Sequence, residues 1–129
     1  MDIPNKETLV NLQLEKAHSF LTQANEMYTM EHWDMAANRF YYACYHAVQA
    51  LFIHEGLSAR RHVGTVTQFS QHFVKTGRID KQYGSFFSQM MQLREKADYN
   101  CFYNVTKQDI DDLTTLSKEF VSRIEELMV

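Results

Sequence analysis

The hydrophobic residues of this chain recur every three to four positions, which is the period of one face of an α-helix. Five stretches carry this pattern, and short polar connections separate them. We place the expected helices at residues 6–29, 32–55, 63–75, 80–100 and from 106 onward. The pattern predicts an all-α fold, an up-and-down bundle of four to five helices that forms a single domain over residues 1–129.

The stretch from Trp33 to Phe52 organises the rest of the chain. It contains no Gly or Pro, so nothing in it breaks a helix. One face of it is apolar, with Trp33, Ala37, Phe40, Cys44, Ala47, Val48 and Leu51. Its other sides carry a polar and aromatic set, Asn38, Arg39, Tyr42, Tyr45 and His46. We therefore expect this helix to be both the centre of the bundle and an interface helix.

Local signals mark where the helices begin and end. Gly56 follows the second helix and fits a C-cap, where a left-handed residue is needed. Gly77 closes the third helix, and Asp80 opens the fourth. Thr106 and Asp109 have the spacing of a capping box that uses the shorter acid. These signals predict short connections between long helices.

Composition supports a helical, folded protein. Hydrophobic residues make up 45% of the 129 positions, which excludes a disordered tail. Four glycines and one proline are too few for the many tight turns of a sandwich or barrel. The N-terminus lacks the pattern of a signal peptide, and no apolar run approaches the roughly 20 residues that span a bilayer. We expect a cytoplasmic protein without a membrane segment.

The charge is slightly negative overall but unevenly spread. A net charge of −3 does not suggest a general polyanion binder. Between residues 59 and 81, however, the basic residues outnumber the single acidic residue, Asp80. They are Arg60, Arg61, Lys75, Arg78 and Lys81. This is either ordinary surface variation or a surface that faces a phosphate backbone or an acidic partner.

Cysteine and histidine give no metal or redox motif. Cys44 and Cys101 both lie in helical patterns; a disulfide between them is possible, but buried free thiols fit a reducing cytoplasm better. The six histidines show neither HExxH nor a spacing of three or four with an acidic ligand. No Gly-rich phosphate loop and no Ser–His–Asp or Cys–His pattern is present. We predict no metal and no cofactor.

The stretch from Ala37 to Ala47, with Arg39-Phe40-Tyr41-Tyr42-Ala43 at its centre, resembles the HEPN family (higher eukaryotes and prokaryotes nucleotide-binding). Three further stretches agree in order and spacing, namely Leu14–Ala17, Gln71–Gly77 and Leu93–Tyr99. The resemblance covers nearly the whole chain. It implies a bundle of four to five helices that pairs as a homodimer. Many members act as toxin and antitoxin with a minimal nucleotidyltransferase, and others bind nucleotides or RNA without cleaving them.

Catalytic members of that family are metal-independent ribonucleases in which an Arg is followed, after four to six residues, by a His. The guanidinium would hold the scissile phosphate, and the imidazole would move the proton of the 2′-hydroxyl. The Arg corresponds to Arg94, but those spacings lead to Tyr99, Asn100 and Cys101, and no histidine follows His72. A phenol titrating near pH 10 is a poor base at neutrality. The resemblance therefore implies a non-catalytic or degenerate member.

In some members a tyrosine two positions beyond that His is nucleotidylated by the antitoxin. Depending on the spacing, that position here falls on Cys101 or a later residue. Tyr99 and Tyr103 are the nearest candidates for such a modification.

Two groups of residues are the candidate site. Arg94 and Asp98 are one helical turn apart, so they form either a plain surface ion pair or a phosphate-binding pair in a dimer cleft. Tyr99 is either a rim residue that stacks on a base or an aromatic at the edge of the core.

The second group consists of Asn38, Arg39, Tyr42, Tyr45 and His46. It is either a buried polar network or one side of a dimer cleft, in which His46 supplies the missing imidazole. We expect the second and fourth helices to pack together, with Arg94 approaching this face.

The function predicted from the sequence is that of a non-catalytic or degenerate HEPN module. It would bind RNA or a nucleotide, or dock a nucleotidyltransferase, and pair with a second copy of itself. The alternative is a metal-independent HEPN ribonuclease toxin that uses Arg94 with an unconventional partner. A helical scaffold without any ligand is the third possibility.

Overall fold

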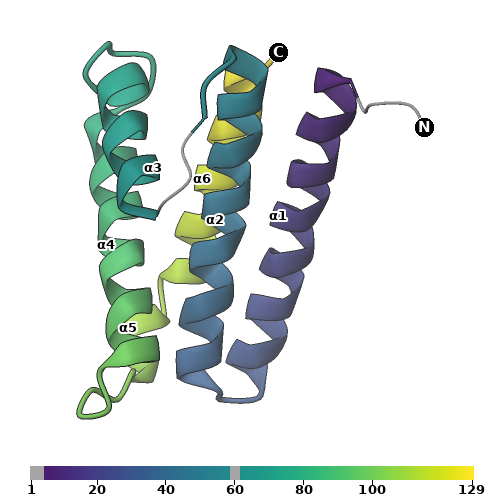
Figure 1. Ribbon diagram of the computed structural model, residues 1–129. Coiled ribbons are helices and arrows are strands. Elements are labelled where there is room, and N and C mark those ends of the chain that lie inside the picture. Colours follow the sequence, from purple (N-terminus) through teal and green to yellow (C-terminus); the bar gives the residue numbers. More distant parts are fainter. Residues whose placement is uncertain (1–4, 59–61) are drawn as a thin grey trace.

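The computed structural model describes residues 5–58 and 62–129, and within them it is an all-α bundle (Figure 1). Its elements in chain order are α1 (Lys6–Thr29), α2 (Trp33–Glu55), α3 (His62–Phe69), the π-helix η1 (Ser70–Val74), α4 (Lys81–Tyr99), α5 (Lys107–Ile110) and α6 (Leu113–Leu127). No strand occurs in these two ranges. The predicted fold class is confirmed.

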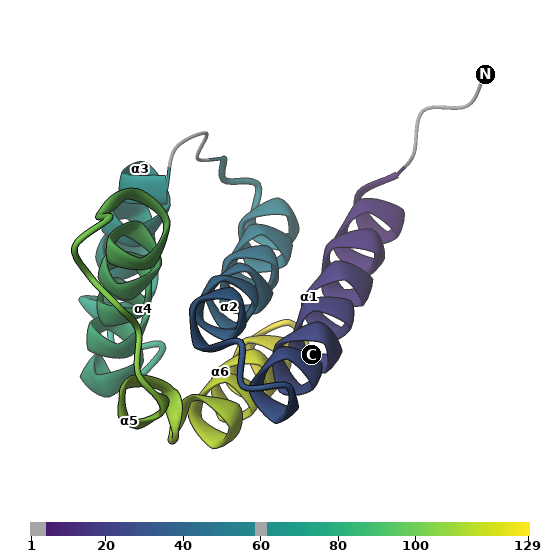
Figure 2. The same cartoon turned by 90° about the horizontal axis from the view of Figure 1, so that it is seen from below.

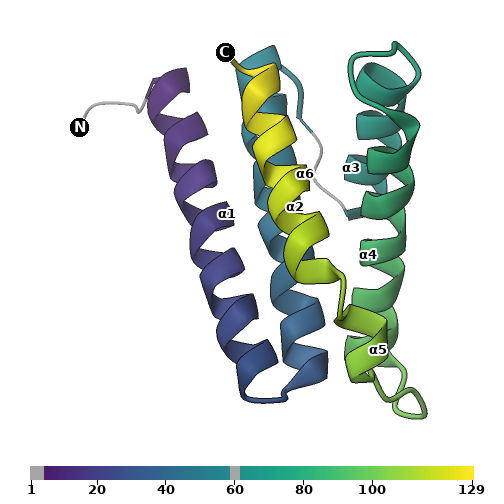
Figure 3. The same ribbon diagram turned by 180° about the vertical axis from the view of Figure 1, so that it is seen from behind.

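Helix α2 is the centre of the bundle, as its sequence predicted. It lies between α1 on one side and the pair α3 and α4 on the other (Figure 2). Helix α6 runs alongside α2 on the far face of the view in Figure 1 and also touches α1 (Figure 3). Ala17 and Ala24 of α1 are fully buried, so small side chains let α1 and α2 approach closely. Larger side chains of α2 also meet α1, where Trp33 packs against Tyr28 and His46 stacks on Phe20.

Aromatic rings fill the space between α3, α4 and α6. The Phe120 ring on α6 has no exposed surface, and its centroid lies 5.7 Å from that of Phe69 and 5.5 Å from that of Phe87. Phe86 and Tyr83 on α4 complete the set at 5.7 and 6.1 Å. Such tilted ring pairs add to the free energy gained from burying their apolar surface. Phe120 thus ties the C-terminal helix to both neighbours.

The predicted cap signals are present at three places. Gly56 and Gly77 take the left-handed conformation, with φ of 75° and 79°. Thr106 and Asp109 form the predicted capping box, in which each side chain accepts a hydrogen bond from the other residue's backbone N–H. Asp80, in contrast, caps α4 without a side-chain hydrogen bond.

Two of the predicted helices differ from those observed. The fifth divides after one short turn, α5, and restarts as α6 at Leu113. The third continues through the π-helix η1, where the wider turn accommodates Phe73 in the core. The hydrophobic period of the sequence alone indicated neither the break between α5 and α6 nor the π-helix.

Helices α2 and α3 run in the same direction. The short connection between them would instead suggest antiparallel neighbours. His62, at the start of α3, contacts Tyr41 in the first half of α2. Phe73, at the end of the same helical segment, stacks on Phe52 near the end of α2, with ring centroids 6.0 Å apart. The start of α3 therefore lies beside the middle of α2 and not beside its end.

The cysteines are both free, but only one is buried. Cys44 lies in the core, where burial raises the pKa of its thiol to about 12. Cys101 follows α4 in an exposed turn, so its prediction as a buried thiol in a helix is wrong. Within the described ranges, the helices are all too short or too polar to cross a membrane.

We expect one thiol per folded chain to react quickly with a colorimetric disulfide reagent, because the exposed Cys101 is accessible and the Cys44 thiol is not. The Cys101→Ser variant should lose the fast phase, whereas unfolding in denaturant should release the second thiol. Two fast thiols in the native protein would contradict the burial of Cys44.

We expect Phe120→Ala to lower the free energy of unfolding by about 3–5 kcal/mol, because it leaves a cavity among rings that cannot close over it. Denaturant unfolding followed by circular dichroism measures this. Phe102→Ala is the matched control, since that ring is 93% exposed and should change the stability by less than about 0.5 kcal/mol. Equal effects of the two substitutions would contradict the observed core.

Candidate functional site

Arg94 of α4 is the centre of the candidate site. It is only 4% exposed, so its description as a surface ion pair is wrong. Its Nη1 atom lies 3.6 Å from a carboxylate oxygen of Asp98 and donates a 3.5 Å hydrogen bond to the Tyr99 hydroxyl. The predicted i, i+4 pair with Asp98 is thus confirmed, although the guanidinium lies inside the protein.

Tyrosine rings enclose the guanidinium. Its carbon lies 5.2 Å from the ring centroid of Tyr41, 5.6 Å from that of Tyr42 and 5.7 Å from that of Tyr99. The faces of aromatic rings attract a cation, which offsets part of the cost of its burial. The Nε atom of Arg94 is buried and has no hydrogen-bond partner among the described residues. One donor of a permanently charged group is therefore left unpaired.

Helix α2 contributes Tyr41, Tyr42 and Tyr45 to this part of the structure. Tyr41 is fully buried, and its pKa lies well above 10 because burial disfavours the phenolate, although the nearby charge of Arg94 lowers it in part. Tyr42 and Tyr45 are half-buried, with ring centroids 5.2 and 6.0 Å from Tyr41. At neutral pH Tyr41 is a hydroxyl group that donates or accepts hydrogen bonds.

His62 joins this cluster from the start of α3, and the sequence analysis missed it. Its Nδ1 atom lies 2.6 Å from the Tyr41 hydroxyl, and its ring centroid is 4.7 Å from that of Tyr45. Burial and then the positive charge of Arg94 lower the pKa of His62 below its ordinary value, while Glu95 opposes them. No sequence spacing linked His62 to Arg94, because the contact depends on the direction of α3.

Asn38 and Arg39 lie next to Asp98 and extend the site to its rim. The Asn38 amide donates to Asp98 at 3.2 Å, and Arg39 donates to the Asn38 oxygen at 2.6 Å. With Asp34 and Met35 these residues line a small hollow of about 230 Å³. Arg94 therefore approaches the predicted face of α2 through Asp98 and Tyr42, as expected.

His46 does not take part in the Arg94 cluster as the missing imidazole. Its Nδ1 atom bonds to Gln13 of α1 at 2.7 Å, and its ring stacks on Phe20 with centroids 5.3 Å apart. Burial, assisted by Lys16, lowers the pKa of His46 to about 4. An imidazole held neutral to that extent is a weak proton acceptor at pH 7, so the role suggested for His46 is not supported by its surroundings.

The rim of the site is aromatic and exposed. Tyr99 is 77% exposed at the end of α4, so it is a rim residue and not an aromatic at the core edge. Phe102, three residues further on, is more exposed still. Tyr103 is half-buried, and its hydroxyl donates to Asp109 at 3.0 Å.

The basic stretch is described only in part. Arg60 and Arg61 lie outside the described residues. Lys75 and Lys81 are exposed along the hollow between η1 and α4, and Arg78 pairs with Glu55. This stretch does not reach the Arg94 cluster through any described contact.

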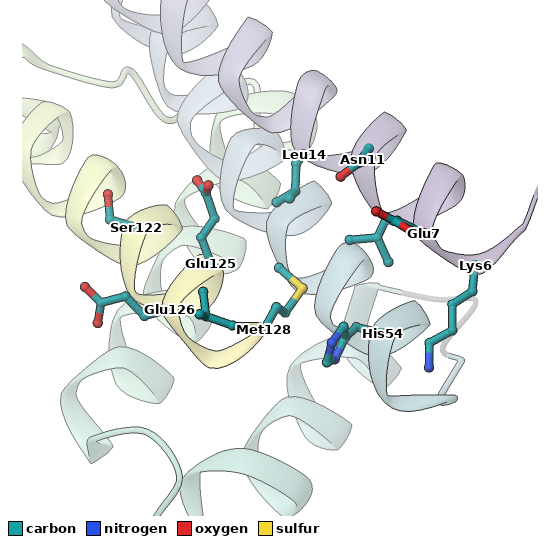
Figure 4. Close-up of a pocket in the computed structure, with 11 residues that line it drawn as sticks. Lys6, Glu7, Asn11, Leu14, His54, Ser122, Glu125, Glu126 and Met128 are labelled. Carbon is teal, nitrogen blue, oxygen red and sulfur yellow. The ribbon is translucent and has the colours of Figure 1, made fainter.

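A larger hollow than the one beside Asp98 lies elsewhere, between the ends of α1, α2 and α6 (Figure 4). It measures about 780 Å³ and is lined by Lys6, Glu7, Leu14, His54, Glu125 and Met128. Glu125 is already paired with His18 at 2.8 Å. Ser122 and His54 both line the hollow, but no hydrogen bond between described residues joins them as a nucleophile and its base would be joined. Across the described part of the chain, no three His, Cys, Asp or Glu side chains gather as a metal site would require.

The Arg94 cluster combines the groups needed to hold a phosphate. A guanidinium provides charge and directed donors, the phenols provide hydroxyl groups, and a neutral imidazole lies beside them. The exposed Tyr99 ring offers a flat surface on which a base can stack.

Comparison with known proteins shows which family the chain resembles. The family model described as "HEPN domain" matches residues 10–127. A protein of Thermotoga maritima named UPF0332 protein is 31% identical over 123 residues, covering 95% of this chain and 93% of its own length. Two proteins of Methanocaldococcus jannaschii, each named "Putative toxin", are 25% and 29% identical and cover 100% and 96% of this chain. Since the family model spans nearly all of the bundle and the site, the chain belongs to the HEPN family.

Proposed function

We propose that the Arg94 cluster binds a phosphate group of RNA or of a nucleotide, and that the chain is the toxin-like component of its system. The observation that carries this proposal is a buried guanidinium in a cage of tyrosines with Nε unpaired. Leaving a charged donor unpaired costs about 1–3 kcal/mol or more, and a bound anion would recover this cost. The names of the two archaeal relatives support the toxin-like role.

Access to Arg94 depends on Tyr99. Its hydroxyl is the outermost partner of the guanidinium, at the long distance of 3.5 Å, and its ring is largely exposed at the last position of α4. A side chain at a helix end with few packing contacts moves readily. Displacing Tyr99 would open Nη1 to a phosphate oxygen and free the ring to stack on the adjacent base.

We further propose that a second copy of the chain covers this rim. Met35 beside Asp98, and Tyr99 and Phe102 at and just after the end of α4, are exposed apolar or aromatic side chains, and a monomer gains nothing from displaying them. A homodimer joined here would place two Arg94 clusters close together, so that a nucleic acid is held from both sides.

Docking of a minimal nucleotidyltransferase stays a prediction that rests on the family resemblance. For modification by such a partner, the Tyr99 hydroxyl is the better candidate than that of Tyr103. Tyr99 is exposed and only weakly bonded, whereas the Tyr103 hydroxyl is bonded to Asp109.

We expect Arg94→Lys to weaken the binding of single-stranded RNA roughly tenfold or more, because a lysine ammonium lacks the fork of donors and the flat ring contacts of arginine. Fluorescence anisotropy with labelled RNA and with adenine nucleotides, over a salt series, measures this loss. The matched control is Arg123→Lys on α6, which should bind as the unmodified protein does.

The melting temperature of Arg94→Lys must be compared with that of the control, since Arg94 is buried. Equal affinity of the two variants would exclude Arg94 as the phosphate ligand. If the unmodified protein binds neither RNA nor any nucleotide, the proposed function is wrong. The third possibility, a helical scaffold without a ligand, would then stand.

We expect the chain to have the mass of a dimer in light scattering after size exclusion, and Phe102→Ser to weaken that dimer, because the substitution removes most of the apolar surface of the rim. Leu12→Ser on α1 is the control, since this residue is also exposed but lies away from the rim. A monomeric mass at every concentration would contradict the proposed pairing.

A further inference from the structure

A hollow lies between α1 and α6 at one end of the bundle, and we call it the α1–α6 hollow (Figure 4). Side chains of these two helices form its walls, and His54 from the last turn of α2 lies between them. Its volume of about 780 Å³ is within the range of ligand pockets. It is an open groove and not a closed cavity, so it is accessible to a large partner.

The floor of the α1–α6 hollow is apolar. Val10 of α1 is 8% exposed, and Leu14 of α1 and Met128 just after α6 are half-buried. Figure 4 shows Leu14 and Met128 on facing sides of the hollow. A partner that covers these side chains removes apolar surface from water, which is favourable. A methionine side chain also adapts its shape to an irregular partner.

Both walls of the hollow carry carboxylates. Glu7 lies on α1 and forms no ion pair with any described residue, while Glu125 and Glu126 lie on α6. Glu125 is paired with His18 at 2.8 Å and Glu126 with Arg123 at 3.2 Å, each through one oxygen. Such exposed pairs contribute little to stability and can exchange for other partners. The walls can therefore accept basic side chains from both sides of the groove.

Lys6 is the one lysine or arginine among the described residues that line the hollow. Its charge acts on Glu55, which does not line the hollow. The pKa of Glu55 is lowered first by its hydrogen bond with Arg78 and, to a smaller extent, by the charge of Lys6. Three glutamates against one lysine give the lining a formal charge of −2 with His54 neutral.

We infer that the α1–α6 hollow binds an amphipathic helix of another protein, with apolar side chains on one face and lysine or arginine on both edges of that face. The apolar face would cover Val10, Leu14 and Met128. The basic edges would meet Glu7 on one wall and the two glutamates of α6 on the other. This is the helix-in-groove mode of recognition, and the docked helix would lie beside α1 and α6.

The chemistry of the hollow favours this occupant over others. Carboxylates on both walls repel the phosphates of a nucleic acid. A small cation would pair with the carboxylates but leave the apolar floor in water. In a second copy of the chain, the exposed Lys75 and Lys81 line a hollow made mostly of serine, threonine and glutamine side chains, which matches this floor poorly.

The inference goes beyond the proposed function, because the two sites share no residue. The Arg94 cluster contacts the first half of α2, from Asn38 to Tyr45, whereas the α1–α6 hollow lies at the last turn of that helix. Loss of helix binding should therefore leave the affinity for RNA unchanged.

The probe is a fluorescent, alanine-based peptide of about 15 residues, the length at which isolated helices begin to form. It carries leucines three and four positions apart and lysines on both edges of that leucine face. One matched probe has glutamate in place of lysine, and another has the same composition in an order without an apolar face. Fluorescence anisotropy with the full chain, at low and at high salt, measures the affinity of each.

The variants separate the walls from the floor of the hollow. Glu7→Gln combined with Glu126→Gln removes one carboxylate from each wall, and Met128→Ser changes the floor. Glu26→Gln is the matched control, since this glutamate is exposed near the other end of α1. The melting temperature of each variant is compared with that of the unmodified protein. Because both wall residues are on the surface, the double variant tests the inference even if Met128→Ser folds poorly.

We expect the lysine peptide to bind at least about tenfold more tightly than the glutamate peptide, because like charges would face each other in the latter. The double variant should lower the affinity about threefold or more at low salt, with a smaller effect at high salt. Met128→Ser should lower it about tenfold at both. In an NMR spectrum of the methionine methyl groups, the signal of Met128 should shift with the peptide and that of the distant, exposed Met30 should not.

Absence of binding by the lysine peptide would overturn the inference, as would equal binding of the glutamate or reordered peptide. An unchanged affinity in the double variant, or an equal loss in Glu26→Gln, would also overturn it. If spermidine alone shifts the Met128 signal and the peptide does not, the hollow is a site for a small cation and the inference is wrong. A change in the mass of the double variant by light scattering, without peptide, would instead identify a second copy as the occupant.

Discussion

The burial of one permanent positive charge constrains the rest of this structure. Arg94 cannot lose its proton at any ordinary pH, so the protein must surround the guanidinium with groups that stabilise it. One carboxylate, that of Asp98, and the faces of three tyrosines do so, and two of these tyrosines belong to α2. The arrangement therefore fixes how α2 and α4 lie against each other. It also leaves one buried donor of the guanidinium, Nε, without a hydrogen-bond partner among the described residues.

Helix α2 meets two different requirements on its two sides. Toward α1 the contact combines the fully buried Ala17 and Ala24 of α1 with larger α2 side chains, since His46 stacks on Phe20 and Trp33 packs against Tyr28. Toward α4 and α3 it presents Tyr41, Tyr42 and Tyr45, whose rings carry hydroxyl groups and cannot be packed as tightly. The tyrosine side carries the hydroxyl groups and rings that surround Arg94. A site on a rigid helix holds its groups more accurately than a site on a loop.

The parallel course of α2 and α3 decides which residues meet at the candidate site. Because α3 begins beside the middle of α2, His62 meets Tyr41 and shares its surroundings with Arg94. Arg94 lies on α4 and His62 at the start of α3, and both side chains lie against the ring of Tyr41 on α2. The rim, with Tyr99 and Phe102 exposed, remains the adaptable part of the site.

The sequence by itself determined the helical period, the central place of α2, the caps at Gly56 and Thr106 and the family, because these depend on local spacing. It also identified Arg94 and Asp98 as a pair, since residues four apart on a helix are neighbours. Only the tertiary structure decided that Arg94 is buried, that Cys101 is exposed, that His46 faces α1 and that His62 joins the site. Each of these four features depends on the direction in which a helix runs and on which helix packs against it. The spacing of nearby residues in the sequence determines neither the direction nor the packing partner.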